Sequence, residues 1–233
     1  MNLRKSKNIL ILVSGSGAQG GAEKQLINLA NNLKSFSIII VVLNPNKKFI
    51  SSINNNSIEL IYTLENNFIS FKNLIGIIKE KVRNTDKKII LQGWLPKGNL
   101  IAFFISFFIQ RKSSIFFSHR NSFFIFQSIQ SQLIIFLTLF LPLISGKKII
   151  HISNSYSIYK YRFIRSFLGN RKFIIKNGFI INKIEEEKLI KSSTNKILKL
   201  LYVARFSPEK GYLTLLKVLK KLNFKYSISL VGS

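Results

Sequence analysis

The chain has 233 residues, 47% of them hydrophobic, and its 36 Lys and Arg against 9 Asp and Glu give a formal net charge of +27. The hydrophobic fraction excludes a disordered polycation, because such chains contain too few apolar residues to bury a core. The absence of Cys excludes a disulfide framework, a thiolate metal site and a cysteine nucleophile, and it favours a reducing compartment.

The positive charge is concentrated in one stretch, because no acidic residue occurs between Asp86 and Glu185. One explanation is a composition rich in Lys, Asn, Ile and Phe throughout; the other is a face that meets phosphates on lipid or on a nucleotide. Nucleic acid is not expected as a partner, because the basic residues are mixed with long apolar runs and no recognition-module signature occurs.

Two apolar segments, 100–109 and 133–144, are shorter than the roughly 20 residues of a membrane-spanning helix. We expect core helices first, with contact to an anionic membrane surface as the alternative, since Lys97, Lys147 and Lys148 flank the segments. The N-terminal apolar run 9–13 is too short for the core of a signal peptide and is expected to be a buried strand.

Short continuous apolar runs alternate with stretches of helical periodicity along the chain. Turns are expected at 14–21, 44–46 and 92–94. Helices are predicted at 22–33, 69–83, 100–109, 128–145, from Ser155 onward, and 211–222. Strands are predicted at 7–13, 37–43, 57–62, 88–91, 114–118, 148–153, 171–175, 196–203 and 226–231, and the first two are expected to be buried. This alternation predicts an α/β fold with a doubly wound parallel sheet.

The composition changes at 184–195, where three consecutive Glu precede a Ser-Ser-Thr-Asn stretch. We therefore expect a first Rossmann-like domain at 1–183, a linker at 184–195 and the start of a second Rossmann-like domain at 196–233. The second unit holds only two predicted strands and one helix, well short of the roughly 100–200 residues of a domain, so it is expected to be incomplete.

A glycine-rich turn at 15–20 matches G-x-G-x-x-G between a predicted strand and a predicted helix. Such a turn can bind a phosphate at the helix N-terminus, or can simply be a tight turn that packs helix on strand. A dinucleotide site also needs an acidic residue about 20 positions on, but the acid after Glu23 is Glu59, so an NAD site is the weaker alternative. Glu23 lies in the helix's first turn, where the dipole favours a carboxylate or where it could contact a sugar or the second domain.

A second candidate loop, 204–211, lies between a predicted strand and a predicted helix, where α/β proteins bind ligands. Arg205 and Lys210 bracket a turn set by Pro208 and Gly211. Two cations there could neutralise a diphosphate, with Arg as a fork and Lys as a point charge. The alternative is a solvated loop in which Glu209 pairs with a neighbouring cation.

The chain resembles glycosyltransferase family 4, the group 1 glycosyltransferases, whose GT-B fold has two Rossmann-like domains. Four segments in the family's order carry the resemblance: Gly20-Gly21-Ala22-Glu23, Ser153-Asn154-Ser155, Lys176-Asn177-Gly178, and the most specific, Leu201-Tyr202-Val203-Ala204-Arg205-Phe206-Ser207-Pro208-Glu209-Lys210-Gly211. The resemblance implies transfer of a sugar, with retention at the anomeric carbon, from a nucleotide-diphosphate donor to a hydroxyl of a polysaccharide or glycolipid acceptor.

The resemblance also implies roles for individual residues. Arg205 and Lys210 would bind the donor diphosphate and stabilise the leaving group, and Gly20 and Gly21 would let their loop approach the donor phosphate and sugar. His119 would contact the sugar or acceptor. The alternative is that His119 is a structural residue that forms hydrogen bonds, and we expect this structural role for His151. No metal or cofactor is expected, the nucleotide sugar being a substrate.

The family's acidic motif, two glutamates seven residues apart that bind the donor, would lie beyond Ser233. We therefore expect a truncated chain that is inactive alone. The resemblance places the protein in the cytoplasm, peripheral on the inner face of the membrane where a lipid-linked acceptor lies. A non-catalytic module that docks on a membrane or partner is the alternative, and an NAD(P)-dependent Rossmann enzyme is a weaker one.

Overall fold

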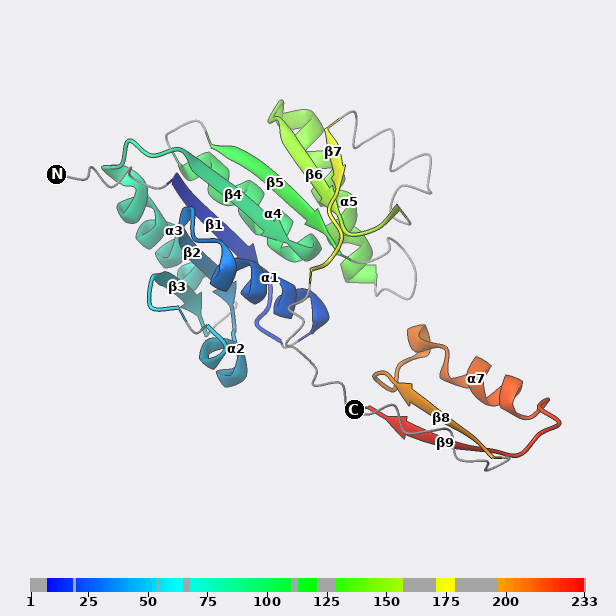
Figure 1. Cartoon of the computed structure of the whole chain (residues 1–233). Helices are drawn as coiled ribbons and strands as arrows, with labels where there is room; N and C mark the ends of the chain where they lie inside the picture. The colour runs from blue at the N-terminus through cyan, green and yellow to red at the C-terminus, as the bar shows by residue number, and fades with distance from the viewer. Residues whose placement is uncertain are drawn as a thin grey trace. The chain divides into compact units, whose positions relative to one another are not determined.

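A computed structural model of the chain shows two compact units (Figure 1). Unit 1 contains the described residues up to 178 and unit 2 those from 197 onward, and we treat each by itself. The structure describes residues 8–18, 20–53, 55–64, 68–109, 113–120, 129–156, 171–178 and 197–232.

Unit 1 is built on a seven-stranded sheet in the order β3-β2-β1-β4-β5-β6-β7, in which every adjacent pair is parallel. Its central strand β1 is buried on both faces after its first residue, as a continuous apolar run requires. The strands are β1 (Asn8–Ser14), β2 (Phe36–Leu43), β3 (Ile58–Thr63), β4 (Ile89–Trp94), β5 (Ser114–His119), β6 (Ile149–Ser153) and β7 (Lys172–Ile174).

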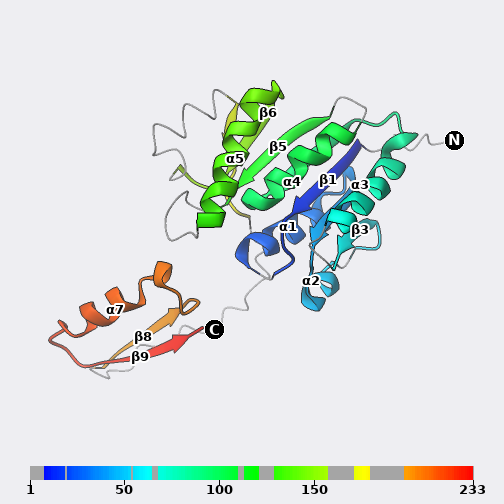
Figure 2. The ribbon, with the colours of Figure 1, turned by 180° about the vertical axis from the view of Figure 1, so that it is seen from behind.

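Helices cover both faces of this sheet. On one face lie α3 (Phe68–Arg83), α4 (Leu95–Phe108) and α5 (Ile129–Ser145), which come to the front in Figure 2. On the other lie α1 (Gly21–Asn32) and α2 (Lys47–Ser51). The order of the strands and the helices on both faces confirm the predicted doubly wound α/β fold.

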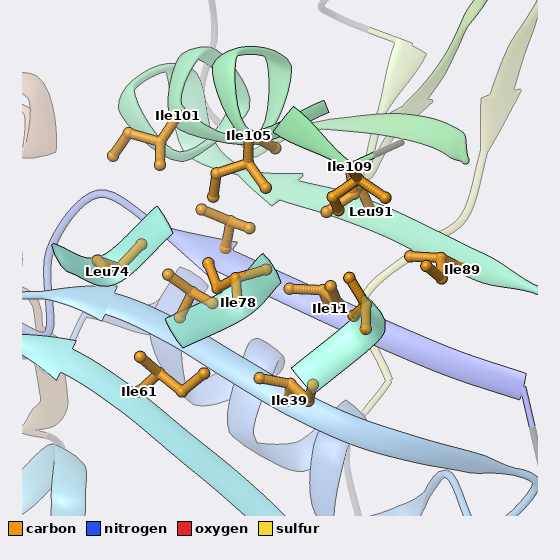
Figure 3. Packing of buried hydrophobic residues seen from close by; sticks show 14 of the residues in the cluster. Ile11, Ile39, Ile61, Leu74, Ile78, Ile89, Leu91, Ile101, Ile105 and Ile109 are labelled. Atoms are coloured by element: carbon orange, nitrogen blue, oxygen red, sulfur yellow. The ribbon is translucent and has the colours of Figure 1, made fainter. Parts of the chain in front are cut away.

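The largest buried cluster lies between the sheet and helices α3 and α4 (Figure 3). Ile11 on the central strand packs there with Ile78 of α3 and Ile105 of α4. The alternate residues of β1, including Leu10 and Leu12, point to a second cluster under α1. Period-two alternation between two apolar clusters explains why β1 has no polar side.

Unit 2 is smaller. Its two parallel strands, β8 (Leu198–Val203) and β9 (Tyr226–Val231), are joined through the 3₁₀ turn η2 (Pro208–Lys210) and the helix α7 (Tyr212–Leu219). Gly232 follows β9 so close to the Ala204 carbonyl that a Cβ there would overlap it. This places the end of β9 directly against the loop that carries Arg205.

Two differences from the predicted elements have physical causes. Residues 92–94 continue strand β4 instead of forming a turn, and α4 begins at once with Leu95 at φ 65°, so the helix starts earlier than the apolar run indicated. The helix α2 was not predicted, although Asn46 caps it by accepting a 2.7 Å bond from the Phe49 N–H. The helix from Ser155 and the linker at 184–195 fall largely or wholly outside the described residues, and the domain boundaries stay predictions.

Candidate functional site

The sheet of unit 1 reverses its winding between β1 and β4, which are neighbours in the middle of the sheet. In open α/β sheets ligands bind outside the carboxyl ends of the strands at this position. The predicted glycine-rich loop follows β1 here, and the N-terminus of α4 follows β4. The candidate site of unit 1 therefore lies at this carboxyl edge.

Glycines allow the two segments at this edge to pack closely. A Cβ on Gly15 would lie 2.4 Å from the Cβ of Lys97, and one on Gly98 would lie 2.4 Å from the Val13 carbonyl oxygen. A third glycine, Gly17, lies against Pro45 in the loop after β2. The glycine-rich turn therefore packs strand against helix. The exposed side chain of Lys97 lies beside this loop.

Gly20 and Glu23 meet at the start of α1. Gly20 is the N-cap residue, and a Cβ on it would lie 2.6 Å from Oε2 of Glu23. Glu23 is only 5% exposed, so its carboxylate lies against the first turn of the helix, where the dipole favours negative charge. This agrees with the helix-dipole interpretation of Glu23, while a contact of Glu23 with a sugar stays a prediction.

His119 ends β5 and is paired with His151 of β6. Nε2 of His119 lies 3.0 Å from Nδ1 of His151, and the two rings are stacked. Burial holds the pKa of His119 well below its ordinary value, with a further contribution from His151, and burial lowers the pKa of His151 to about 4. Both imidazoles are therefore neutral at pH 7, and with His119 only 3% exposed the geometry favours the structural alternative for it.

Arg120 follows His119 and joins three strand ends. Its guanidinium lies over the Trp94 ring at 4.2 Å from the centroid, and its Nη1 donates a 2.6 Å bond to Oδ1 of Asn177. Trp94 in turn donates from Nε1 to the Ala22 carbonyl in α1, at 2.7 Å. Burial lowers the pKa of Arg120 from its ordinary value, and its buried Nε has no hydrogen-bond partner among the residues that the structure describes.

Two buried side-chain amides form hydrogen bonds with Ser118 near the end of β5. Asn99 of α4 accepts a 3.0 Å bond from the Ser118 N–H and donates to the Ser118 carbonyl, and Gln92 of β4 donates to the Ser118 hydroxyl at 2.9 Å. Sequence reasoning did not single out Arg120, Asn99 or Gln92. The available signal was a polar side chain inside an apolar strand or helix, since such a group must be hydrogen-bonded when it is buried.

The family landmarks of unit 1 gather at this same edge. Gly20 and Gly21 lie at the start of α1, after the loop that follows β1, and Asn177 follows β7. Ser153, the last residue of β6, closes a turn in which its hydroxyl donates to the Ser155 carbonyl at 2.6 Å. Residues far apart in the sequence are thus brought to one side of the sheet.

In unit 2, Arg205 and Lys210 follow the carboxyl end of β8, and both are exposed. Lys210 ends the turn η2, and Gly211 takes the left-handed conformation at φ 73° that lets the chain turn into α7. Tyr202 donates its hydroxyl to the Lys210 carbonyl, which ties the turn to the strand. Beside Arg205, the buried hydroxyl of Ser207 has no hydrogen-bond partner within the described part of the chain.

Known protein structures share this fold. HepE of Anabaena, in complex with UDP and glucose, is 18% identical with a TM-score of 0.68, covering 97% of this chain and 61% of that chain. The lipopolysaccharide outer core galactosyltransferase WaaB, in its apo form, is 13% identical with a TM-score of 0.60, covering 95% and 60%. A glycosyltransferase from Rickettsia africae is 18% identical with a TM-score of 0.61, covering 98% and 61%.

At these identities the likeness shows the fold. The chain has the same fold as these proteins, which confirms the Rossmann-like α/β architecture expected from the family resemblance. It spans 60–61% of the length of the solved structures it matches. No protein-family model matches the chain, and no curated protein matches its sequence.

Proposed function

We propose that the chain is part of a glycosyltransferase that moves a sugar from a nucleoside-diphosphate donor to a hydroxyl of a cell-surface polysaccharide or glycolipid. The observation that carries the proposal is the place of Arg205 and Lys210, two exposed cations on the turn that follows β8. Support comes from the shared fold, since one structure with this fold binds UDP and glucose and another is a galactosyltransferase.

In the proposed reaction, the bond between the anomeric carbon and the diphosphate oxygen breaks, and a bond from the acceptor oxygen to that carbon forms. The proton of the acceptor hydroxyl passes to the departing diphosphate oxygen, on which negative charge develops as its bond to the sugar breaks. Arg205 and Lys210 would stabilise that charge, Arg as a fork of donors and Lys as a point charge. The family resemblance supports retention at the anomeric carbon, and no cofactor or metal is required by this scheme.

In unit 1, the loop after β1 is the candidate for binding a phosphate or sugar. Gly20 and Gly21 have no side chain to obstruct the approach of a phosphate or sugar to the N-terminus of α1. Glu23 behind Gly20 would accept a hydrogen bond from a sugar hydroxyl. A contact of His119 with the sugar or acceptor is implied by the family resemblance alone, because the buried ring stacked on His151 fits the structural alternative.

The NAD(P) alternative is less well supported. A dinucleotide-binding sheet has an acidic residue at the end of its second strand to bind the ribose. Here β2 ends at Leu43, and the residue that follows is Asn44. The docking-module alternative predicts lipid binding without any affinity for nucleotides.

The test is nucleotide-sugar binding by the purified chain, measured by isothermal titration with UDP-, GDP- and ADP-sugars. We expect one class of donor to bind, and Arg205→Ala and Lys210→Ala each to weaken binding at least about tenfold, since charge-assisted bonds to phosphate contribute about 1.5–3 kcal/mol each. Lys217→Ala is the matched control, because Lys217 is an exposed cation of α7 away from the turn.

The proposal would be contradicted by equal losses in Arg205→Ala and Lys217→Ala, and also by an unaltered chain that binds neither a nucleotide sugar nor a nucleoside diphosphate. Binding of NADH in preference to every nucleotide sugar would favour the dehydrogenase alternative. All three side chains are exposed, so near-ultraviolet and far-ultraviolet circular dichroism should be unchanged in each variant.

A further inference from the structure

Helices α4 and α5 lie side by side on one face of the sheet of unit 1, as Figure 2 shows. Their outward faces carry large apolar side chains that are 40% exposed or more. We call this the α4–α5 surface, and it consists of Phe104, Phe107, Phe108, Leu133, Phe136, Phe140, Leu143 and Ile144.

The apolar character of this surface is regular. Along α5 the exposed residues Leu133, Phe136, Phe140 and Leu143 recur at spacings of three and four, which places them on one side of the helix. The opposite side, with Ile135 and Leu139, is buried in the unit. A helix that covers a sheet normally presents polar residues to water, so a helix that is apolar on both sides marks an interaction surface.

Aromatic residues at this surface are bordered by cations. Nζ of Lys147 lies 4.1 Å from the centroid of Phe107, and it donates to the Ser106 carbonyl at 2.9 Å. Nζ of Lys79 lies 5.6 Å from the centroid of Phe108. A pocket beside Phe108 is lined by Lys79, Glu80 and Arg83, whose charges sum to a net positive charge.

Neither helix contains Asp or Glu, and the exposed Lys148 extends the basic border beyond Lys147. Phe and Leu that can enter the boundary of a bilayer, next to Lys that can contact lipid phosphates, form the pattern of a peripheral membrane surface. A protein partner would have to present complementary acidic and apolar groups in a fixed geometry. An anionic bilayer supplies negative headgroups and an apolar interior without such a geometry.

We propose that the α4–α5 surface docks on an anionic lipid bilayer, with its Phe side chains at the acyl boundary and Lys79, Lys147 and Lys148 on headgroup phosphates. The inference does not rest on the proposed function, because it uses only the outer faces of α4 and α5 and their basic border. The helices would lie on the membrane: among the described residues, no helix is long and apolar enough to cross one.

The test is co-sedimentation of the full chain with vesicles of phosphatidylcholine alone or with one third phosphatidylglycerol. We expect binding to the anionic vesicles that weakens at least about tenfold in the double variant Phe136→Ser/Phe140→Ser, since each lost ring removes on the order of 1 kcal/mol of burial. Ile50→Ser is the control, because Ile50 is exposed on α2 at the opposite face of the sheet.

Two charge-reversal variants test the role of the basic border. Lys148→Glu is expected to weaken binding several-fold more than Lys34→Glu, which makes the same change of net charge at an exposed position after α1. Equal effects of the two changes would contradict a defined docking face and indicate nonspecific attraction of a chain with charge +27.

Other outcomes would overturn the proposal directly. Equal binding to neutral and anionic vesicles would exclude the proposed headgroup contacts. Retained binding by a folded Phe136→Ser/Phe140→Ser variant would exclude the apolar contact. Concentration-dependent dimers that this variant abolishes, without vesicle binding by the unaltered chain, would assign the surface to a second copy.

Discussion

The guanidinium of Arg120 lies over the ring of Trp94, 4.2 Å from its centroid, at the carboxyl edge of the sheet. Trp94 ends β4, and Arg120 follows β5, the neighbouring strand. Asn177 after β7 accepts a hydrogen bond from Arg120, and Ala22 in α1 accepts one from Trp94. The contact therefore connects the first helix with the ends of β4, β5 and β7, which lie on one side of the switch point. Because the chain has one Trp, its fluorescence reports on this edge alone.

We expect Arg120→Ala to lower the free energy of unfolding by about 1–2 kcal/mol, through loss of the cation–π contact and the bond to Asn177. Arg120→Lys should retain only part of this stabilisation, because an ammonium cannot both stack on Trp94 and reach Asn177 as a planar guanidinium does. Urea unfolding followed by Trp94 fluorescence measures both. Full recovery by Lys would show that the planar geometry is unimportant.

The His119–His151 pair predicts a pH dependence of stability. Both histidines have lowered pKa values in the folded state, so the unfolded chain takes up protons first as the pH falls below about 6.5. The stability is complete above that pH and is lost on acidification, by about 3 kcal/mol at pH 4 from His151 alone. Urea midpoints should be nearly level from pH 7.5 to about 6.5 and should then fall steadily to pH 5.

The double variant His119→Asn/His151→Gln is the control for this titration. Its urea midpoint should be nearly constant between pH 6.5 and 5, where carboxylates contribute little. A flat profile in the unaltered chain, or the same slope in the double variant, would show that the imidazoles are not the groups responsible.

Glycine substitutions test the close packing at the switch point. Gly98→Ala should destabilise unit 1 by about 2 kcal/mol or more, because its Cβ would meet the rigid Val13 carbonyl, whereas Gly15→Ala should cost less, because the side chain of Lys97 can move. Gly76→Ala in α3 meets no atom and should stabilise by about 0.5–1 kcal/mol. Thermal unfolding ranks the three, and equal effects would contradict the packing described.

Replacing Asn99 should lower the free energy of unfolding by more than its polar character suggests. Asn99→Leu would leave the buried N–H and carbonyl of Ser118 without their partner, at a cost of about 2–4 kcal/mol. Asn32→Ala, at an exposed position that bonds only within α1, should change stability by less than about 0.5 kcal/mol. An Asn99→Leu variant of unchanged stability would mean that water replaces the amide at the end of β5.

Much of the fold could be predicted from the sequence because the strands of a buried parallel sheet are continuous apolar runs. The strand predicted at 226–231 has the bounds of β9, and the other strands differ by a few residues at their ends. The early start of α4 could not be predicted, because Leu95 adopts a left-handed conformation that side-chain pattern does not encode. The short helix α2 lacks periodicity, although Asn46 offered a capping signal.

The candidate site was predictable in its loops and not in its contacts. Glycines after β1 and the cations on the turn after β8 are local patterns, so they could be found in the sequence. The pairing of Arg120 with Trp94, and of His119 with His151, depends on the order of strands in the sheet. Only the topology brings residues so distant in the chain to one edge.

The most direct test of the central claim is ligand-observed NMR of nucleotides with the full chain, in competition. We predict that a bound nucleotide sugar is displaced by its nucleoside diphosphate at lower concentration than by the monophosphate, and that the difference disappears in Arg205→Ala. Equal displacement by mono- and diphosphate in the unaltered chain, or displacement by NADH alone, would contradict a diphosphate site at Arg205 and Lys210.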